Sequence, residues 1–178
     1  MDRITMKKKE SLGFFDTQPS YDDWKLIGTM NKLQVWIDDS SDESLWVEVI
    51  DPSVQHGRSP QRKKRVLEIQ LSLQDFKAYH IDITRLDTKY SGRGIAAKAY
   101  RYIMRKLNIT LQAGECQSAG GRKIWFDLAQ MNGLIVFGKT RTGKPEVVGI
   151  NKVTREVTLS KREVYDGERS VYVFARAV

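Results

Sequence analysis

The sequence predicts an α+β fold in which a mixed, mostly antiparallel sheet carries two main helices. First, residues 24–73 contain apolar segments with period-two alternation and show no helical periodicity, which predicts strands in a helix-poor N-terminal half. Second, residues 76–137 have the pattern strand, helix, strand, helix, strand. Third, strand-like alternation returns at 146–159 and 170–177, so strands are expected on both sides of the helical part of the chain.

Length and composition indicate one globular domain. The chain has 178 residues, of which 40% are hydrophobic, enough for a single core. Residues 1–20 are polar and are expected to be a loosely held lead-in to a domain over 21–178. The net charge of +8 favours an anionic partner, such as a CoA-type cofactor, a nucleic acid or an acidic protein surface. A solvated basic surface without a specific partner remains the alternative.

The cysteine and histidine content argues against a metal centre. Cys116 is the only cysteine, which excludes an intrachain disulfide, and His56 and His80 are the only histidines. The chain has no apolar run of 18 residues, and its first ten residues lack the apolar segment of a secretory signal. We therefore expect a cytoplasmic protein, monomer or homodimer, that needs no metal and does not associate with a membrane.

Four strands and one exposed loop are expected in the N-terminal half. Residues 24–30 and 33–37 form a hairpin about an Asn-Lys turn, and residues 44–50 and 66–73 alternate as the next two strands. Residues 51–64 combine Pro, Gly and Ser, and a basic cluster follows at positions 62–65. That cluster could contact phosphates or only keep the loop soluble, and the sequence does not decide between them.

The chain is organised around residues 81–104, where an alternating strand over 76–86 leads through a glycine turn into a basic amphipathic helix that begins at Ile95. Gly92 and Gly94 allow the main chain to bend and to approach a ligand. The first amides of the helix have no intrahelical acceptor, so the corner is suited to a phosphate or pyrophosphate. A plain strand-to-helix connection is the alternative. Period two divides the strand into Tyr79, Ile81 and Ile83 on one face and His80, Asp82 and Thr84 on the other.

The C-terminal part alternates between strands and one further helix. Residues 109–113 are expected to form a strand, and Ser118 is placed to cap a helix over 119–131 that Asn132 and Gly133 stop. A short strand at 134–137, a hairpin over 146–151 and 153–159 and a last strand at 170–177 follow. Residues 138–144 match the glycine and lysine spacing of a P-loop, but Pro145 stands where that motif needs Ser or Thr, which favours a turn.

The glycine turn resembles a known cofactor loop. Residues 90–96, Tyr-Ser-Gly-Arg-Gly-Ile-Ala, resemble the acetyl-CoA pyrophosphate loop of the GCN5-related N-acetyltransferases (GNATs), whose pattern is Arg/Gln-x-x-Gly-x-Gly/Ala. Gly94 and Ala96 fill the last two defined positions, and Ser91 stands where the family usually has Arg or Gln. A second pattern is similar to short acetyltransferase-like proteins encoded by bacteriophages, and its residues are Ser118, Gly120, Gly121 and Trp125.

The resemblance implies a GNAT-like sheet whose fourth and fifth strands, here 76–86 and 109–113, splay apart to admit the pantetheine arm of acetyl-CoA. It implies that main-chain groups near Leu86, which could also polarise the thioester, pair with the pantetheine. The cofactor-binding residues that follow from it are Leu86, Asp87 and Thr88 for the pantetheine, Ser91, Gly92, Arg93, Gly94, Ile95 and Ala96 for the pyrophosphate, and Trp125 at the position of a family Tyr.

The catalytic residues expected on this basis are His80, Asp82 and Ser118. We rank His80 first as general base and Asp82 second, with Glu115 and Glu68 in reserve; the alternative for His80 is a half-buried strand histidine bonded to a neighbour. Trp125 cannot protonate the leaving thiolate, because its indole N–H is not an acid near neutral pH. Ser118 could still donate a hydrogen bond to the thiolate or the pantetheine, and water is the alternative for handling the leaving group. Cys116 is not expected to act as a nucleophile, since Glu115 would activate it poorly.

Two functions are therefore expected from the sequence. The first is an acetyl-CoA-dependent N-acyltransferase that acts on an amine of a protein, a nucleic acid or a small molecule. The alternative is a catalytically degenerate protein of the same fold that binds nucleic acid or a host protein through its basic surface.

Overall fold

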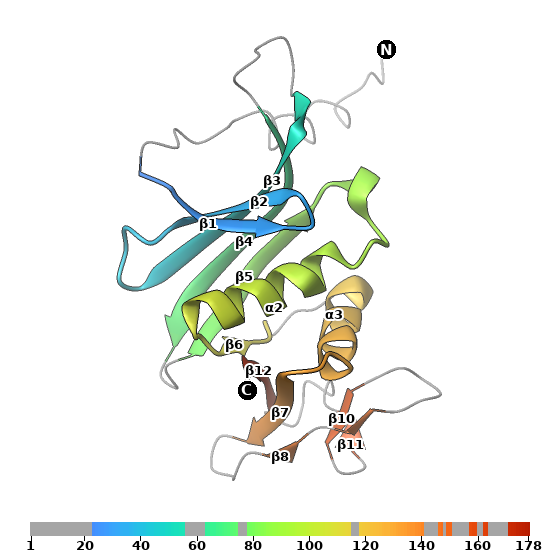
Figure 1. The fold of residues 1–178 in the computed structure, drawn as a ribbon. Helices are drawn as coiled ribbons and strands as arrows, with labels where there is room; N and C mark the ends of the chain where they lie inside the picture. The colour runs from blue at the N-terminus through green and yellow to red at the C-terminus, as the bar shows by residue number, and fades with distance from the viewer. Residues whose placement is uncertain are drawn as a thin grey trace, which may run out of the picture.

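A nine-stranded mixed sheet forms the body of the fold, and two α-helices lie next to each other beside it (Figure 1). The fold is α+β with mostly antiparallel pairing, as the sequence predicts. The computed structural model describes residues 23–55, 63–74, 78–114, 118–140, 146–147, 149–150, 157–159, 162–163 and 171–178. No helix within these segments is both long enough and apolar enough to cross a membrane.

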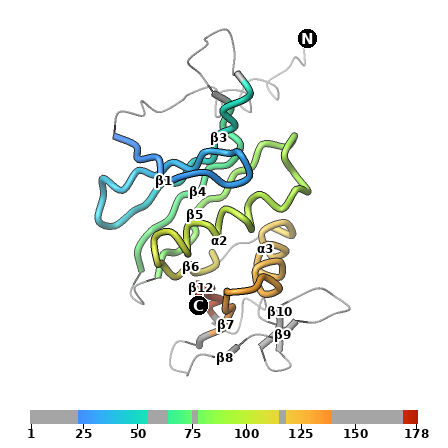
Figure 2. The backbone as a smooth tube through the Cα atoms, viewed as in Figure 1, coloured from blue at the N-terminus to red at the C-terminus, as the bar shows by residue number. Residues whose placement is uncertain are grey.

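The strands of the large sheet follow the chain at first and then depart from it. All neighbours are antiparallel except β5 and β6, which are parallel and need a crossover connection. The last strand, β12, is inserted between β6 and β7 (Figure 2). The order across the sheet is β1 (Lys25–Met30), β2 (Leu33–Asp38), β3 (Ser44–Gln55), β4 (Lys63–Gln74), β5 (Ala78–Leu86), β6 (Leu111–Gln112), β12 (Val171–Ala177), β7 (Leu134–Thr140) and β8 (Glu146–Val147).

A small second sheet accompanies the large one. Its strands are β9 (Gly149–Ile150), β10 (Val157–Leu159) and β11 (Arg162–Glu163), and they pair antiparallel. The hairpin expected over 146–159 is therefore divided, because β8 pairs with β7 in the large sheet and only β9 pairs with β10. The connection between β9 and β10 lies outside the described residues.

The two helices begin at the residues that the sequence indicates. The crossover helix α2 (Ile95–Leu107) follows a single 3₁₀ turn, η1 (Thr88–Tyr90), and ends at Asn108, whose φ of 53° stops it. α3 (Ala119–Ala129) is capped by Ser118 as predicted, but it ends two residues before the expected Met131. The strand predicted at 109–113 is reduced to the two residues of β6.

The core is one apolar cluster that joins the central strands to α2. Its strand residues alternate with period two on β2 to β5. The helix α2 contributes Ala99, Ile103 and Met104, which lie on one side of the helix and are fully buried. The strand members that are fully buried are Val35, Val47, Val49, Val66, Leu67, Ile69, Leu71, Leu111 and Ala175.

The basic cluster at 62–65 differs from its prediction. β3 extends to Gln55 and β4 begins at Lys63, so the strands take up both ends of the loop expected over 51–64, half of its residues. Arg65 is 5% exposed, and its guanidinium lies 2.8 Å from a Glu48 carboxylate oxygen and 2.9 Å from one of Glu68. Neither of the two roles considered for the basic cluster, contact with phosphates or solubility, therefore explains the buried position of Arg65. Arg62 and the side chain of Lys63 lie outside the described residues.

Other expectations also lie outside the described part of the chain. They are the lead-in over 1–20, His56, Glu115, Cys116, and the segment 141–145 of the P-loop-like pattern.

Gly28 allows β1 to pass close to α2. Its φ is +136°, and a Cβ there would lie 2.3 Å from the Tyr102 hydroxyl oxygen. We expect Gly28→Ala to lower the free energy of unfolding by about 1–3 kcal/mol, measured by urea denaturation, because it adds backbone strain and a clash.

Tyr102→Phe provides the control. It removes the hydroxyl that donates to Ile27 O at 3.2 Å, which costs about 1 kcal/mol on its own. In that background Gly28→Ala should cost less, since the clash is gone. An equal cost in both backgrounds would contradict the close approach.

Candidate functional site

β5 and β6 separate after a short parallel contact. They pair at only two positions, Tyr79 with Leu111 and His80 with Gln112. The chain then turns from β6 toward the last strand, and Ala113 N donates to Val173 O at 2.8 Å. Beyond this point, β5 has no neighbouring strand on that edge in the described part of the protein. These are the two strands for which the GNAT resemblance implies a splayed arrangement.

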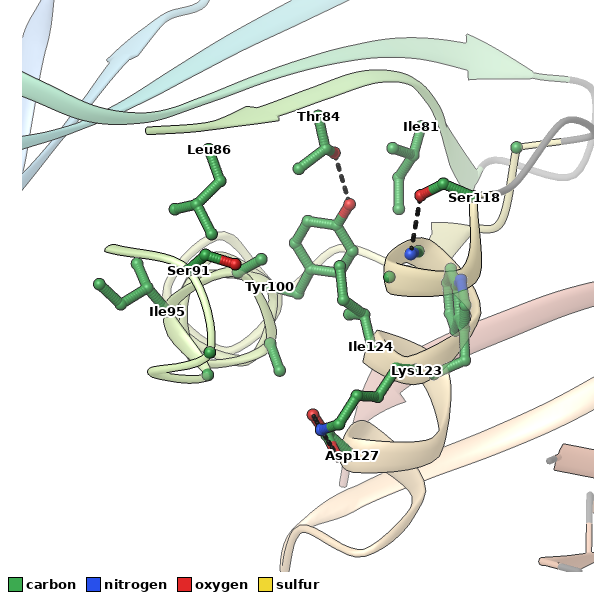
Figure 3. Close-up of a pocket in the computed structure, with 18 of the residues that line it drawn as sticks. Ile81, Thr84, Leu86, Ser91, Ile95, Tyr100, Ser118, Lys123, Ile124 and Asp127 are labelled. Atoms are coloured by element: carbon green, nitrogen blue, oxygen red, sulfur yellow. Dashed lines mark hydrogen bonds and ion pairs between the residues drawn. The ribbon is translucent and has the colours of Figure 1, made fainter. Parts of the chain in front are cut away.

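A bulge in β5 changes which side chains face the helices. Leu71 of β4 pairs with Ile81, but Gln70 pairs with Ile83, so Asp82 is an extra residue in β5. The period-two assignment is therefore wrong beyond Asp82. Thr84 shares the helix-facing side with Ile81 (Figure 3).

A cavity of about 480 Å³ lies where β5, α2 and α3 meet (Figure 3). β5 contributes side chains that point toward the helices, and the turn before α2 and the first turns of both helices complete the wall. Its lining includes Ile81, Asp82, Thr84 and Leu86 of β5, Ser91, Gly92, Gly94, Ile95, Ala96, Ala97 and Tyr100 of the turn and α2, and Ser118, Gly120, Gly121 and Trp125 at α3.

The N-terminus of α2 faces this cavity without side-chain obstruction. Gly92 and Gly94 have φ values of 75° and 66°, and a Cβ at either would meet nothing within 4 Å. The first helical hydrogen bond runs from Lys98 N to Gly94 O at 3.1 Å, so the amides of Ile95 and Ala96 have no intrahelical acceptor. The macrodipole gives this end a partial positive charge.

The N-terminus of α3 borders the same cavity. Ser118 Oγ accepts a hydrogen bond from Gly121 N at 3.1 Å, and the first main-chain bond of the helix runs from Arg122 N to Ser118 O. The Ser118 hydroxyl thus serves as the cap, while its own O–H can still donate to another group. The positive ends of two helix dipoles therefore meet at one cavity.

Tyr100 and Trp125 form the buried wall between the helices. Their rings lie 6.4 Å apart, and both side chains are almost fully buried. Tyr100 Oη lies 2.6 Å from Thr84 Oγ1, and burial raises the pKa of Tyr100 to about 12. Sequence reasoning missed Tyr100, although its position one turn after Ala96 could have indicated it.

His80, Asp82 and Ser72 form a polar group beside the gap in the sheet. His80 Nδ1 lies 2.8 Å from Asp82 Oδ1, and Ser72 Oγ donates to the same oxygen at 3.1 Å. Asp82 lines the cavity, whereas His80 does not and is half-buried on the opposite sheet face beside Ser72. The structure thus places Asp82, not His80, next to the cavity.

Asp87 anchors the turn and does not line the cavity. Its amide donates to Val66 O, its carbonyl accepts from Tyr90 N, and its carboxylate pairs with Lys64 and accepts from Lys89 N. Its main-chain groups are therefore not available to a pantetheine. Burial by itself would raise the pKa of Asp87, but the hydrogen bonds from Lys64 and the Lys89 amide outweigh it and lower the pKa.

A second contact ties the turn to β3. Tyr90 Oη donates to Asp51 Oδ2 at 2.9 Å, and burial together with this carboxylate raises the pKa of Tyr90 to about 12. The Arg93 guanidinium lies over the Tyr90 ring, 5.2 Å from its centre. Neither Arg93 nor Thr88 lines the cavity, and both are exposed.

Glu68, a reserve base, is not part of this site. It lies on the sheet face opposite α2, next to Arg65, and it does not line the cavity. Burial raises its pKa, although Arg65 and Arg85 act in the other direction. The described residues contain no group of three or more His, Cys, Asp or Glu side chains that could hold a metal ion.

Comparison with known proteins gives no match to this chain among family models, curated proteins or solved structures.

Asp87→Asn should destabilise the protein in a pH-dependent way. The lowered pKa means that ionised Asp87 contributes stability above its ordinary pKa of 3.8, and that this stability is lost as the pH falls through the lower pKa of the folded state. We expect the free energy of unfolding of the variant to be about 1–3 kcal/mol lower than that of the wild type at pH 7, and this difference to shrink toward pH 3. Urea denaturation followed by tryptophan fluorescence at several pH values measures this.

Asp39→Asn is the matched control. Asp39 pairs with Lys25 in an exposed ion pair, which contributes little to stability. A difference between Asp87→Asn and wild type that stays constant from pH 7 to pH 3 would contradict the role of the Asp87 charge.

Proposed function

We propose that this protein is an acetyl-CoA-dependent N-acyltransferase that transfers an acetyl group to an amine of a protein, a nucleic acid or a small molecule. The observation that carries the proposal is the cavity between β5, α2 and α3, with two helix N-termini at its border. Its volume of about 480 Å³ lies within the range of small-molecule sites.

The pyrophosphate of acetyl-CoA binds at the start of α2 in this proposal. The amides of Ile95 and Ala96 supply hydrogen-bond donors, and the helix dipole adds favourable electrostatics. The absence of a Cβ at Gly92 and Gly94 lets the phosphates approach the main chain. Ser91, which stands at the family's Arg or Gln position, lines the cavity with its hydroxyl side chain.

The pantetheine arm extends along the free edge of β5. Two amides in this arm can hydrogen-bond to a strand edge in the manner of an added strand. The edge is available because β6 turns away after Gln112. Among Leu86, Asp87 and Thr88, only Leu86 lines the cavity, so the contacts that we assign lie from Ile81 to Leu86.

The reaction needs a base and a route for the leaving group. The amine nitrogen forms a bond to the acetyl carbonyl carbon, the carbon–sulfur bond breaks, and CoA leaves as a thiolate. Asp82 takes the amine proton, and His80 and Ser72 orient it. The other carboxylate in the cavity wall, Asp127, is paired with Lys123. Ser118 donates a hydrogen bond to the thiolate through the O–H that its cap does not use. Tyr100 does not protonate the thiolate, because a phenol with a pKa of about 12 is a weaker acid than the thiol that would form.

Two experiments test the proposal at different steps. Isothermal titration with acetyl-CoA measures binding, and the absence of binding at millimolar ligand to folded protein would end the proposal. Mass spectrometry of a cell extract incubated with isotope-labelled acetyl-CoA and the protein identifies the acceptor. Binding without any labelled product would leave a catalytically inactive binding protein in place of an enzyme.

Gly94→Glu should abolish acetyl-CoA binding, measured by titration. The space around Gly94 is open, so the fold should survive with a backbone strain of about 1–3 kcal/mol at its positive φ. Gly94→Gln is the matched control with the same strain and bulk but no charge. We expect it to bind acetyl-CoA more tightly than Gly94→Glu; equal affinities would contradict a phosphate site at this turn.

Asp82→Asn should lower kcat by about 10²–10⁴-fold, measured on the acceptor that mass spectrometry identifies, because general-base catalysis contributes a factor of this size. Acetyl-CoA affinity should be unchanged. Ser72→Ala removes one hydrogen bond to Asp82 and should cost much less. A kcat for Asp82→Asn within threefold of wild type would exclude Asp82 as the base.

A further inference from the structure

A second hollow lies on the outer side of α2, away from the cavity. It has a volume of about 580 Å³ and is open to solvent. We call it the basic groove; its walls are Met30 and Asn31 at the β1–β2 turn and Lys98, Arg101, Tyr102, Arg105 and Lys106 of α2. The cavity instead uses Ile95, Ala96, Ala97 and Tyr100 of the same helix, so one helix serves two separate surfaces.

The four cations of the basic groove have no carboxylate partner among the described residues. Elsewhere in the described chain, cations such as Lys25, Lys64 and Lys123 form ion pairs. Residues 88–114 contain no Asp or Glu at all. They carry Lys89, Arg93, Lys98, Arg101, Arg105 and Lys106. This concentration of one charge sign creates a positive potential that attracts a polyanion.

The basic groove is held in shape by neighbouring structure. Arg101 donates to Asn132 O at 3.1 Å, and Arg105 packs so closely on Gly133 that a Cβ there would lie 2.6 Å from its guanidinium. The Tyr102 hydroxyl is bonded to Ile27 O, which fixes the ring in the groove wall. The groove therefore presents two held guanidinium groups and one fixed aromatic ring.

The spacing of these groups suits a chain of phosphates with unpaired bases. Lys98, Arg101 and Arg105 follow one another at three- and four-residue intervals along one side of α2. A second row, at four-residue intervals, also starts at Lys98 and continues with Tyr102 and Lys106, so the ring lies between two lysines. From Lys98 to Lys106 the helix rises about 12 Å. Such an alternation of cations with an aromatic side chain is the arrangement that binds single strands, in which cations follow the backbone and bases stack.

We infer that the basic groove binds single-stranded nucleic acid. This inference does not rest on the proposed acyltransferase activity, because none of the residues tested lines the cavity. The charges favour a polyanion, and the half-buried Tyr102 ring favours unpaired bases over a duplex, whose bases are not accessible for stacking.

Fluorescence anisotropy with labelled 20-nucleotide oligothymidylate and oligouridylate tests this inference. The double variant Arg105→Gln with Lys106→Gln should bind roughly 20-fold more weakly at 0.1 M salt, since each lost phosphate contact removes about 0.7 from the slope of log K against log salt. The loss of two contacts should make this negative slope shallower by about 1.4. The matched control is Lys25→Gln with Arg176→Gln, which removes two exposed positive charges outside the groove.

Several outcomes would overturn the inference. The first is that the wild-type protein does not bind the oligonucleotides at low salt. The second is that the Lys25 and Arg176 control loses as much oligonucleotide affinity as the groove variant. The third is that a duplex of the same length, or polyglutamate, binds more tightly than the single strands. Titration with acetyl-CoA separates the two proposals. The Arg105 and Lys106 variant should bind acetyl-CoA as wild type does, whereas Gly94→Glu should retain oligonucleotide binding.

Discussion

The early separation of β5 from β6 is the constraint on which the candidate site depends. Two residue pairs hold these strands together, and the chain then leaves β6 to pair with β12. Gly114 allows the chain to pass close to β5 just after β6 ends, because a Cβ there would lie 2.6 Å from Ile81 O. The bulge at Asp82 acts at the same place, since it brings a carboxylate to the gap and turns Thr84 toward Tyr100. One irregular stretch of strand thereby provides both an open edge and a polar group beside it.

Buried charge fixes the turn that precedes α2. Lys64 is adjacent in sequence to Arg65, which pairs with Glu48 and Glu68 inside the sheet. Such buried pairs gain little net stability but are costly to break, so they constrain the position of the strand that carries them. Lys64 extends this constraint to Asp87, whose main chain is bonded to β4 and η1. The glycines that follow are flexible by composition, yet the segment before them is firmly held.

The sequence predicts those features that depend on neighbours along the chain. The start of α2 after Gly94 and the cap at Ser118 follow from local chemistry, and both are confirmed. The burial of Arg65 could not be predicted, because its partner Glu48 is on another strand and a basic run usually indicates exposure. The bulge at Asp82 also depends on cross-strand register, so the period-two rule failed beyond it. The insertion of β12 between β6 and β7 pairs it with β6, about sixty residues earlier in the chain, which no local pattern encodes.

The short length of β6 has a mechanical consequence. It is the only strand through which the described sheet connects β1–β5 to β12, β7 and β8, and it contributes two residue pairs on each side. With so few pairs at β6, the two parts are joined mainly by packing: α2 contacts both β1 and β12, and Val136 and Val173 belong to the same apolar cluster as Val47 and Ile69. The relative position of the two parts, and with it the gap beside Asp82, is therefore set by side-chain packing on α2 more than by the main-chain hydrogen bonds of the sheet.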